Sequence, residues 1–206
     1  MMTLRIDAER VTMIGRFSAI LMVAISMGAC ALPDPAVRFP DITFSHLAPI
    51  RLDVGAVDYS QTYISPAKIP NVEHLFPLRP SVVARRWSDD RIEAVGAISR
   101  IARVTLINAA VIGTTLDTTQ GLKGAFTIDQ AARYDATVEI LIEIINSQGV
   151  IEGQATAIAQ RSRTAPENIT LNDRDQLWFE LTEAVMADLD REMEATIRKY
   201  LGKYVR

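Results

Sequence analysis

Hydrophobic and polar residues alternate most regularly over residues 133–146, and this alternation predicts a β-strand. One parity carries the apolar side chains of Tyr134, Ala136, Val138, Ile140, Ile142 and Ile144. The other parity is mostly polar, with Asp135, Thr137, Glu139 and Glu143. One buried face and one wet face are typical of an antiparallel sheet. The turn signal at residues 146–149 then predicts an antiparallel partner strand over residues 150–162, whose small residues would let a helix approach closely.

Apolar residues at a spacing of four predict a long helix over residues 172–201. Its stripe consists of Leu177, Leu181, Val185, Leu189, Met193 and Ile197. Acidic residues lie in its first turn and Arg198 and Lys199 in its last, an order that complements the helix dipole. A second helix is predicted over residues 81–99, with Ser81 as its N-cap and Val83, Trp87, Val95 and Ile98 near one stripe.

Two further segments have strand character. Residues 50–56 alternate between apolar and polar, and a bulge near Gly55 would explain why the apolar set then changes parity. Residues 102–113 are rich in Val, Ile and Thr, which predicts a largely buried strand. Residues 64–80, 114–132 and 161–167 are expected to be connections. The predicted fold is α+β, a mainly antiparallel sheet of about four strands with two helices packed on one face.

An apolar run precedes all of these elements and ends at Cys30, the only cysteine of the chain. It reads FSAILMVAISMGAC, follows Arg16, and is shorter than the roughly 20 apolar residues that span a bilayer. Met27, Gly28 and Ala29 occupy the three positions before the cysteine. The run resembles the lipobox of bacterial lipoprotein precursors, which implies that Cys30 receives palmitate and becomes the mature N-terminus. The alternative is a short N-terminal membrane helix with an incidental cysteine.

These patterns divide the chain into three parts. Residues 1–29 are predicted to be a lipoprotein signal peptide, residues 30–49 a lipidated cysteine and proline-rich tether, and residues 50–206 a single α+β domain. Phe39, Ile42 and Phe44 leave open that part of the tether packs on the domain. Met13 would begin a signal peptide more typical than Met1 does. Ala31 after the cysteine, by resemblance to enterobacterial sorting, implies an outer-membrane lipoprotein that faces the periplasm.

Charge and chemistry exclude several classes of function. The net charge of −3 provides no basic surface for nucleic acid, and a single cysteine allows no disulfide framework. There are two histidines, His46 in the tether and His74 beside Glu73 in a proline-rich loop, and neither forms a triad pattern or a zinc-site spacing. We therefore predict no catalytic residue, no metal, no cofactor and no small-molecule substrate. The chain is not expected to be an enzyme.

A protein partner is the remaining expectation. The long connection over residues 64–80 contains four prolines and apolar side chains without a periodicity that would bury them. Tyr59, Tyr63, Leu75 and Phe76 are the candidate residues of an exposed contact surface. The alternative is that Leu75 and Phe76 cap the core. Trp87 and Trp178 lie on helix stripes and are expected in the core.

The segment Arg86-Trp87-Ser88-Asp89 is similar to a short feature of the auxiliary lipoproteins of ABC-type envelope transport systems. That resemblance implies a non-enzymatic accessory subunit of lipid or lipopolysaccharide transport, held to the membrane by its lipid and bound to a transporter subunit. A periplasmic interaction module that regulates a cell-wall enzyme is the alternative. A hydrolase is a third class, disfavoured by the shortage of histidine.

Overall fold

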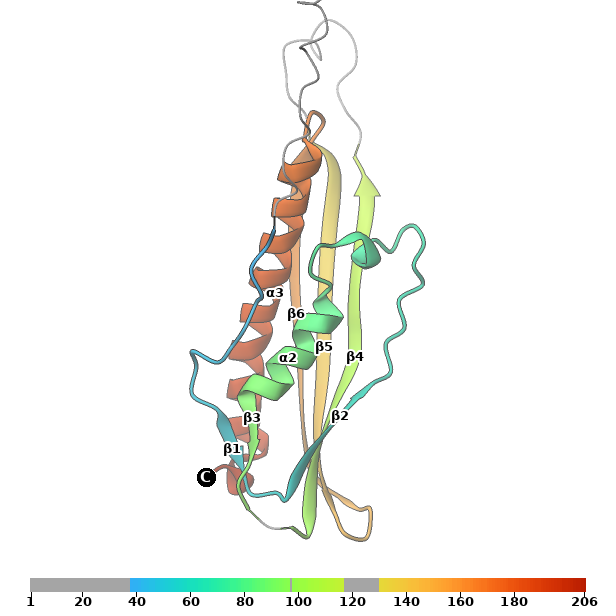
Figure 1. The fold of residues 1–206 in the computed structure, drawn as a ribbon. Helices are drawn as coiled ribbons and strands as arrows, with labels where there is room; N and C mark the ends of the chain where they lie inside the picture. Colours follow the sequence, from blue (N-terminus) through green and yellow to red (C-terminus); the bar gives the residue numbers. More distant parts are fainter. Residues whose placement is uncertain (1–37, 97, 117–129) are drawn as a thin grey trace, which may run out of the picture. The chain divides into compact units, whose positions relative to one another are not determined.

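A four-stranded sheet forms where the sequence alternates or is rich in β-branched residues. The computed structural model describes residues 38–96, 98–116 and 130–206, within the unit Val37–Arg206. The strands are β2 (Ala56–Gln61), β4 (Arg100–Thr115), β5 (Gln130–Asn146) and β6 (Ile151–Pro166), in the order β2-β4-β5-β6. β4, β5 and β6 are antiparallel neighbours, whereas β2 is parallel to β4 (Figure 1). The α+β class is therefore confirmed, and the sheet is mixed.

The turn between β5 and β6 is the one expected from the sequence. The side-chain oxygen of Asn146 accepts the backbone N–H groups of Gln148 and Val150, both at 3.0 Å. Gly149 has φ of 79°, a left-handed conformation that glycine adopts without steric cost. These contacts fix the antiparallel register that buries the apolar parity of β5.

Two helices cover one face of the sheet (Figure 1). The longer, α3 (Leu171–Tyr200), begins at Thr170, whose hydroxyl accepts the backbone N–H of Asp173 at 3.1 Å. Its 30 residues span about 45 Å. It lies close to β6 because that strand presents small residues. A Cβ added to Gly153 would come within 2.8 Å of Leu201.

The shorter helix, α2 (Pro80–Arg91), ends earlier than predicted. The expected helix over residues 81–99 is wrong in its second half, because residues Ile92–Ala94 form strand β3, parallel to β1 (Ile50–Leu52). The backbone N–H of Val95 bonds to Leu52 at 3.0 Å and that of Gly96 to Val54 at 3.1 Å. Val95 and Ile98 therefore lie exposed in a turn. β1 also bridges Val205 near the chain end.

Other boundaries also differ from the predicted ones. Residues 50–63 form two strands in separate sheets, and the change of parity near Gly55 marks the passage between them. The expected loop over residues 161–167 is wrong for its larger part, since β6 continues to Pro166 opposite β5. Most of the expected connection over residues 114–132 lies outside the described residues, and its ends belong to β4 and β5.

The hydrophobic core lies between the helices and the sheet. Trp87 and Trp178 are both buried there, as predicted, together with the stripe of α3. The described part of the predicted tether, residues 38–49, also contributes. Phe39 stacks on Phe179 with ring centroids 5.0 Å apart, and Ile42 and Phe44 are buried. Residues 38–49 therefore pack on the domain and do not form an extended tether.

Candidate functional site

The loop that joins β2 to α2, residues 62–79, is organised around Glu73. Glu73 is the only acidic residue of this loop, and it is 3% exposed. Its Oε1 accepts the hydroxyl of Tyr63 at 2.6 Å and that of Ser65. Its Oε2 accepts the backbone N–H of Val111 in β4 at 3.1 Å and the side-chain amide of Asn71 at 3.5 Å. One carboxylate thus ties the start of the loop and its middle to β4.

Electrostatics agrees with this geometry. Burial by itself raises the pKa of Glu73. The hydrogen bonds from Ser65, Tyr63 and Val111 together lower it by more than burial raises it, so the pKa lies below its ordinary value. Burial and the bond to Glu73 raise the pKa of Tyr63. The carboxylate is therefore ionised and the phenol neutral at physiological pH.

The loop also pairs with β4 through its backbone. β2 leaves β4 at Leu106, and farther along the same strand Val72 donates to Val111 and Gly113 donates to Pro70, both at 2.9 Å. The approach is close at Gly113, where an added Cβ would lie 3.1 Å from the Val72 side chain. The loop is a fixed part of the fold, although its sequence has no helix or strand period.

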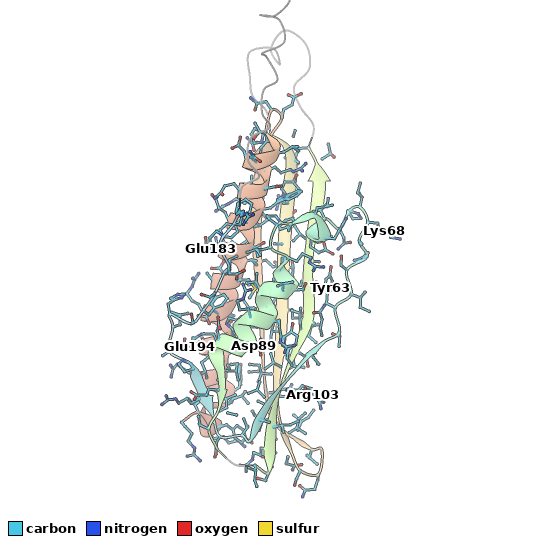
Figure 2. The ribbon with its side chains drawn as sticks, viewed as in Figure 1. Tyr63, Lys68, Asp89, Arg103, Glu183 and Glu194 are labelled. Atoms are coloured by element: carbon cyan, nitrogen blue, oxygen red, sulfur yellow. The ribbon has the colours of Figure 1, made fainter. Side chains whose placement is uncertain are left out.

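Apolar side chains project from this fixed loop into solvent. Ile64 and Ile69 are each 85% exposed, and Leu75 is exposed as well. Lys68, which precedes Ile69 in the chain, lies at the outer side of the loop (Figure 2). We call Ile64, Lys68, Ile69 and Leu75 the loop surface. Because ordering a loop costs conformational entropy, a loop ordered before binding can present side chains to a partner at a smaller cost.

The four residues predicted from the sequence to form a contact surface lie in different environments. Leu75 is exposed and belongs to the loop surface. Phe76 is buried and stacks on Trp178, with ring centroids 4.8 Å apart. Tyr63 is directed to Glu73 through its hydroxyl. Tyr59 packs partly on the core beneath the guanidinium of Arg85, and burial raises its pKa to about 12. The sequence argument did not single out Ile64, Ile69 or the anchoring role of Glu73. The one acidic residue in a long, largely apolar loop is the signal that could have found Glu73.

A second polar cluster, within the core, joins α2 to α3. The guanidinium of Arg91, 2% exposed, donates to Asp190 at 2.6 Å and to Glu194 at 2.6 Å. Asp190 also accepts the indole N–H of Trp87 at 2.8 Å, and Arg91 reaches the carbonyl of Ala48. A buried charge needs such partners to be tolerated. The cluster fixes how both helices and the segment before β1 pack together.

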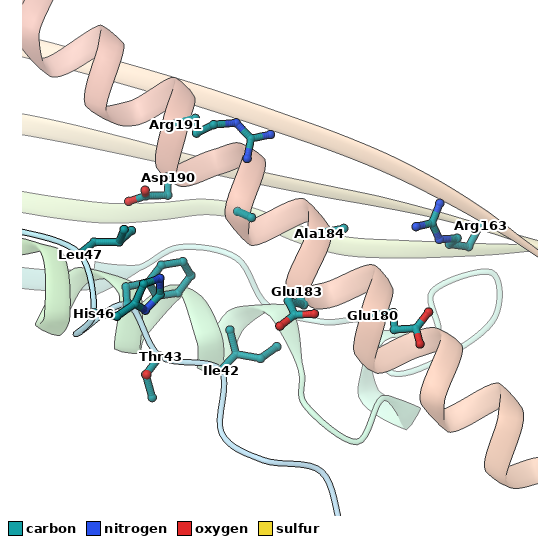
Figure 3. A pocket seen from close by; sticks show the side chains of 12 residues that line it. Ile42, Thr43, His46, Leu47, Arg163, Glu180, Glu183, Ala184, Asp190 and Arg191 are labelled. Carbon is teal, nitrogen blue, oxygen red and sulfur yellow. The ribbon is translucent and has the colours of Figure 1, made fainter.

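A groove of about 660 Å³ lies between residues 42–47 and the middle of α3 (Figure 3). Its lining includes the apolar side chains of Ile42, Leu47 and Ala184 and the charged side chains of Glu183 and Arg191. His46 lies in this lining, away from His74. Over the described residues there is no group of three or more His, Cys, Asp and Glu that could hold a metal ion.

Three arginines of α2 and β6 form ion pairs. Arg85 bonds to Asp89 at 3.2 Å, Arg86 to Asp41 at 3.2 Å, and Arg161 to Asp188. Cys30 lies outside the described residues, so its lipidation stays a prediction. Within the part of the chain that the structure describes, no helix is long and apolar enough to cross a membrane.

The fold defines a class only broadly: two helices on one face of a mixed four-stranded sheet. No family model and no curated protein matches the sequence. Among solved structures, rare lipoprotein B from Shewanella oneidensis is 12% identical with a TM-score of 0.38, covering 70% of this chain and 96% of that one. A minor lipoprotein from Acinetobacter baumannii is 12% identical with a TM-score of 0.36, covering 69% and 88%. A Xanthomonas campestris protein is 12% identical with a TM-score of 0.32, covering 76% and 91%. At these values the similarity carries no argument about function.

Proposed function

We propose that this chain is a lipid-anchored, non-enzymatic accessory subunit of a lipid or lipopolysaccharide transport system in the bacterial envelope. In this proposal Cys30 carries the lipid, and the domain faces the periplasm from the outer membrane. The proposal takes its localisation from the run FSAILMVAISMGAC and its partner class from the similarity at Arg86-Trp87-Ser88-Asp89.

The loop surface is the observation that supports a binding role. Isolated exposed apolar residues are common on proteins, but Ile64 and Ile69 lie on one loop that a buried carboxylate holds in place. The fixed geometry suits contact with an apolar patch on another subunit, with Lys68 adding attraction to an acidic neighbour.

Lipidation is tested first, with a tagged fatty acid fed to cells that express the full chain. The wild-type protein is expected to take up the label and the Cys30→Ala variant is expected not to. Equal labelling of the two proteins would overturn the anchor. Separation of the two membranes on a sucrose gradient then tests the location, since recovery with inner-membrane markers would contradict outer-membrane sorting.

The partner is tested by photocrosslinking in living cells, with a photoreactive residue in place of Ile69 on the loop surface. The matched control carries the same residue in place of Thr156, which is exposed on β6. A crosslink to a subunit of an ABC-type transport system from position 69 alone would support the proposal. A crosslink to a cell-wall enzyme would overturn it in favour of a regulatory interaction module.

A further inference from the structure

Three segments that are distant in sequence meet at one end of the domain, which we call the lower end. They are the turn between β3 and β4, the turn between β5 and β6, and residues 199–206 (Figure 1). Register places the turns together, because Arg100 at the start of β4 is paired with Asn146 at the end of β5. The third segment joins them where Tyr204 and Leu201 pack over Gly153. The first described residues lie away from the lower end, since Phe39 packs against Phe179 near the other end of α3.

The lower end exposes apolar side chains on both turns. Ile98 is 97% exposed and Val95 is exposed on the first turn, and Val150 and Ile151 are exposed on the second. Tyr200 adds a half-exposed aromatic ring at the end of α3. Backbone bonds brace the first turn, since Gly55 donates to Arg100 at 2.9 Å and Gly96 donates to Val54 at 3.1 Å. These bonds hold the two ends of the first turn against residues 54–55.

The charges of the lower end leave two lysines without a carboxylate partner. Glu93 pairs with Arg51 at 3.0 Å, Glu152 with Arg100 at 2.7 Å, and Asp53 with Arg206. Among the described residues, neither Lys199 nor Lys203 forms an ion pair. Both are exposed, and their ammonium groups lie over Tyr200 at 4.8 Å and over Tyr204 at 4.7 Å from the ring centroids.

A shallow depression connects Lys203 to the apolar side chains of the turn between β5 and β6. It is lined by Arg100, Lys203, Val150 and Ile151 together with the paired carboxylates of Asp53 and Glu152. Arg100 lies on one side of the Tyr204 ring at 5.6 Å, and Lys203 contacts the same ring. The lower end thus combines exposed apolar side chains, an aromatic ring beneath a lysine, and cations without an ion-pair partner. This combination suits the interface of a bilayer with anionic headgroups.

We propose that the lower end docks on an anionic lipid bilayer surface. Val95, Ile98, Val150 and Ile151 enter the interfacial region, while Lys199 and Lys203 meet headgroup phosphates. The chain as a whole is acidic, with a net charge of −3, so attraction to such a surface is confined to an end like this one and orients the domain. The inference goes beyond the proposed function, because it requires neither a transporter nor the loop surface.

The test uses the full chain carried in neutral phosphatidylcholine nanodiscs, mixed with dense vesicles of phosphatidylcholine with or without phosphatidylglycerol. Sedimentation with the vesicles measures docking by the domain. We expect capture only by the anionic vesicles, weakened by added salt. Lys199→Gln with Lys203→Gln should weaken capture about thirtyfold, since each lysine near an anionic surface is worth about fivefold. Ile98→Ser with Val150→Ser should also weaken it.

Matched controls separate the lower end from general charge and stickiness. Lys68→Gln removes a cation from the loop surface, and Leu171→Ser removes an exposed apolar side chain at the start of α3. Both controls should bind like the wild type, and circular dichroism should show every variant folded. Equal capture by neutral vesicles, or a lysine variant that binds like the controls, would overturn the proposal. So would the absence of vesicle binding with a crosslink from position 203 to an envelope protein, which would make the lower end a protein interface.

Discussion

Replacing Glu73 by glutamine tests whether one carboxylate holds the loop between β2 and α2. The amide has the same shape, but it has one acceptor oxygen and places an NH₂ group against the donors that Glu73 now satisfies, among them Val111 and Tyr63. Hydrogen bonds to a charged group contribute about 1.5–3 kcal/mol each, and losses within one network do not add. We expect Glu73→Gln to lower the free energy of unfolding by about 2–4 kcal/mol. Each kcal/mol corresponds to about 2–4 °C in Tm for a domain of this size.

The assay is urea unfolding followed by tryptophan fluorescence, because Trp87 and Trp178 are both buried. Glu183→Gln is the matched control, since Glu183 is exposed on α3 and its replacement should change stability by less than about 0.5 kcal/mol. Hydrogen exchange at the amide of Val111 should quicken only in the Glu73 variant. A Glu73→Gln protein as stable as the Glu183→Gln protein would refute the reasoning, and the loop would then be held by its backbone pairing alone.

The same variant predicts a pH dependence with a definite sign. The folded pKa of Glu73 lies below its unfolded value of about 4.3, so its contribution is complete above that value and is lost as pH falls through the folded pKa. The stability difference between wild type and Glu73→Gln should therefore be constant from neutral pH to about pH 5 and shrink below it. A difference that grows in acid would contradict the assignment.

Three further substitutions test the packing. Asp190→Ala should cost about 3–5 kcal/mol, because it removes one of the two carboxylates that pair with the buried Arg91 and the acceptor of the Trp87 indole. Asp188→Ala removes ion pairs to exposed arginines and should cost less than about 1 kcal/mol by the same urea assay. Phe76→Ala should cost about 3–5 kcal/mol as a buried aromatic, and a loss below about 1 kcal/mol would show that its ring is not part of the core. Gly96→Ala should lower Tm, because the added Cβ would lie 2.6 Å from the backbone of Asp53, and an unchanged Tm would contradict that close approach.

The spacing of apolar residues and the turn signal at residues 146–149 predicted the parts of the fold that depend on residues close together in sequence. The strand over residues 133–146 agrees with β5 within three residues, and the helix over residues 172–201 agrees with α3 within one residue; the turn between β5 and β6 lies at Asn146 as predicted. The end of α2 was missed because Val95 and Ile98 match a helical stripe, while the pairing of Ile92–Ala94 with β1 depends on a segment forty residues away. The parallel pairing of β2 with β4 is equally non-local.

The candidate site was predicted less well for a related reason. An apolar residue in a loop can be a core cap or a contact residue, and only the folded chain separates Phe76, which is buried on Trp178, from Leu75, which is exposed. The sequence shows Glu73 as an ordinary acid, because its four donors come from three positions in the loop and one in β4. The lower end was missed because its turns and the chain end are far apart in sequence.

The loop between β2 and α2 also affects whether β4 can pair with another copy of the chain. β2 covers only the first part of this edge of the sheet, as far as Leu106, and beyond it the backbone groups of Val111 and Gly113 are engaged by the loop instead. An uncovered strand edge is a template for pairing with another chain. If the Glu73→Gln variant releases the loop, we expect it to expose an edge rich in Val, Ile and Ala. Loss of the carboxylate would then favour intermolecular β-pairing, and its cost would include aggregation as well as stability.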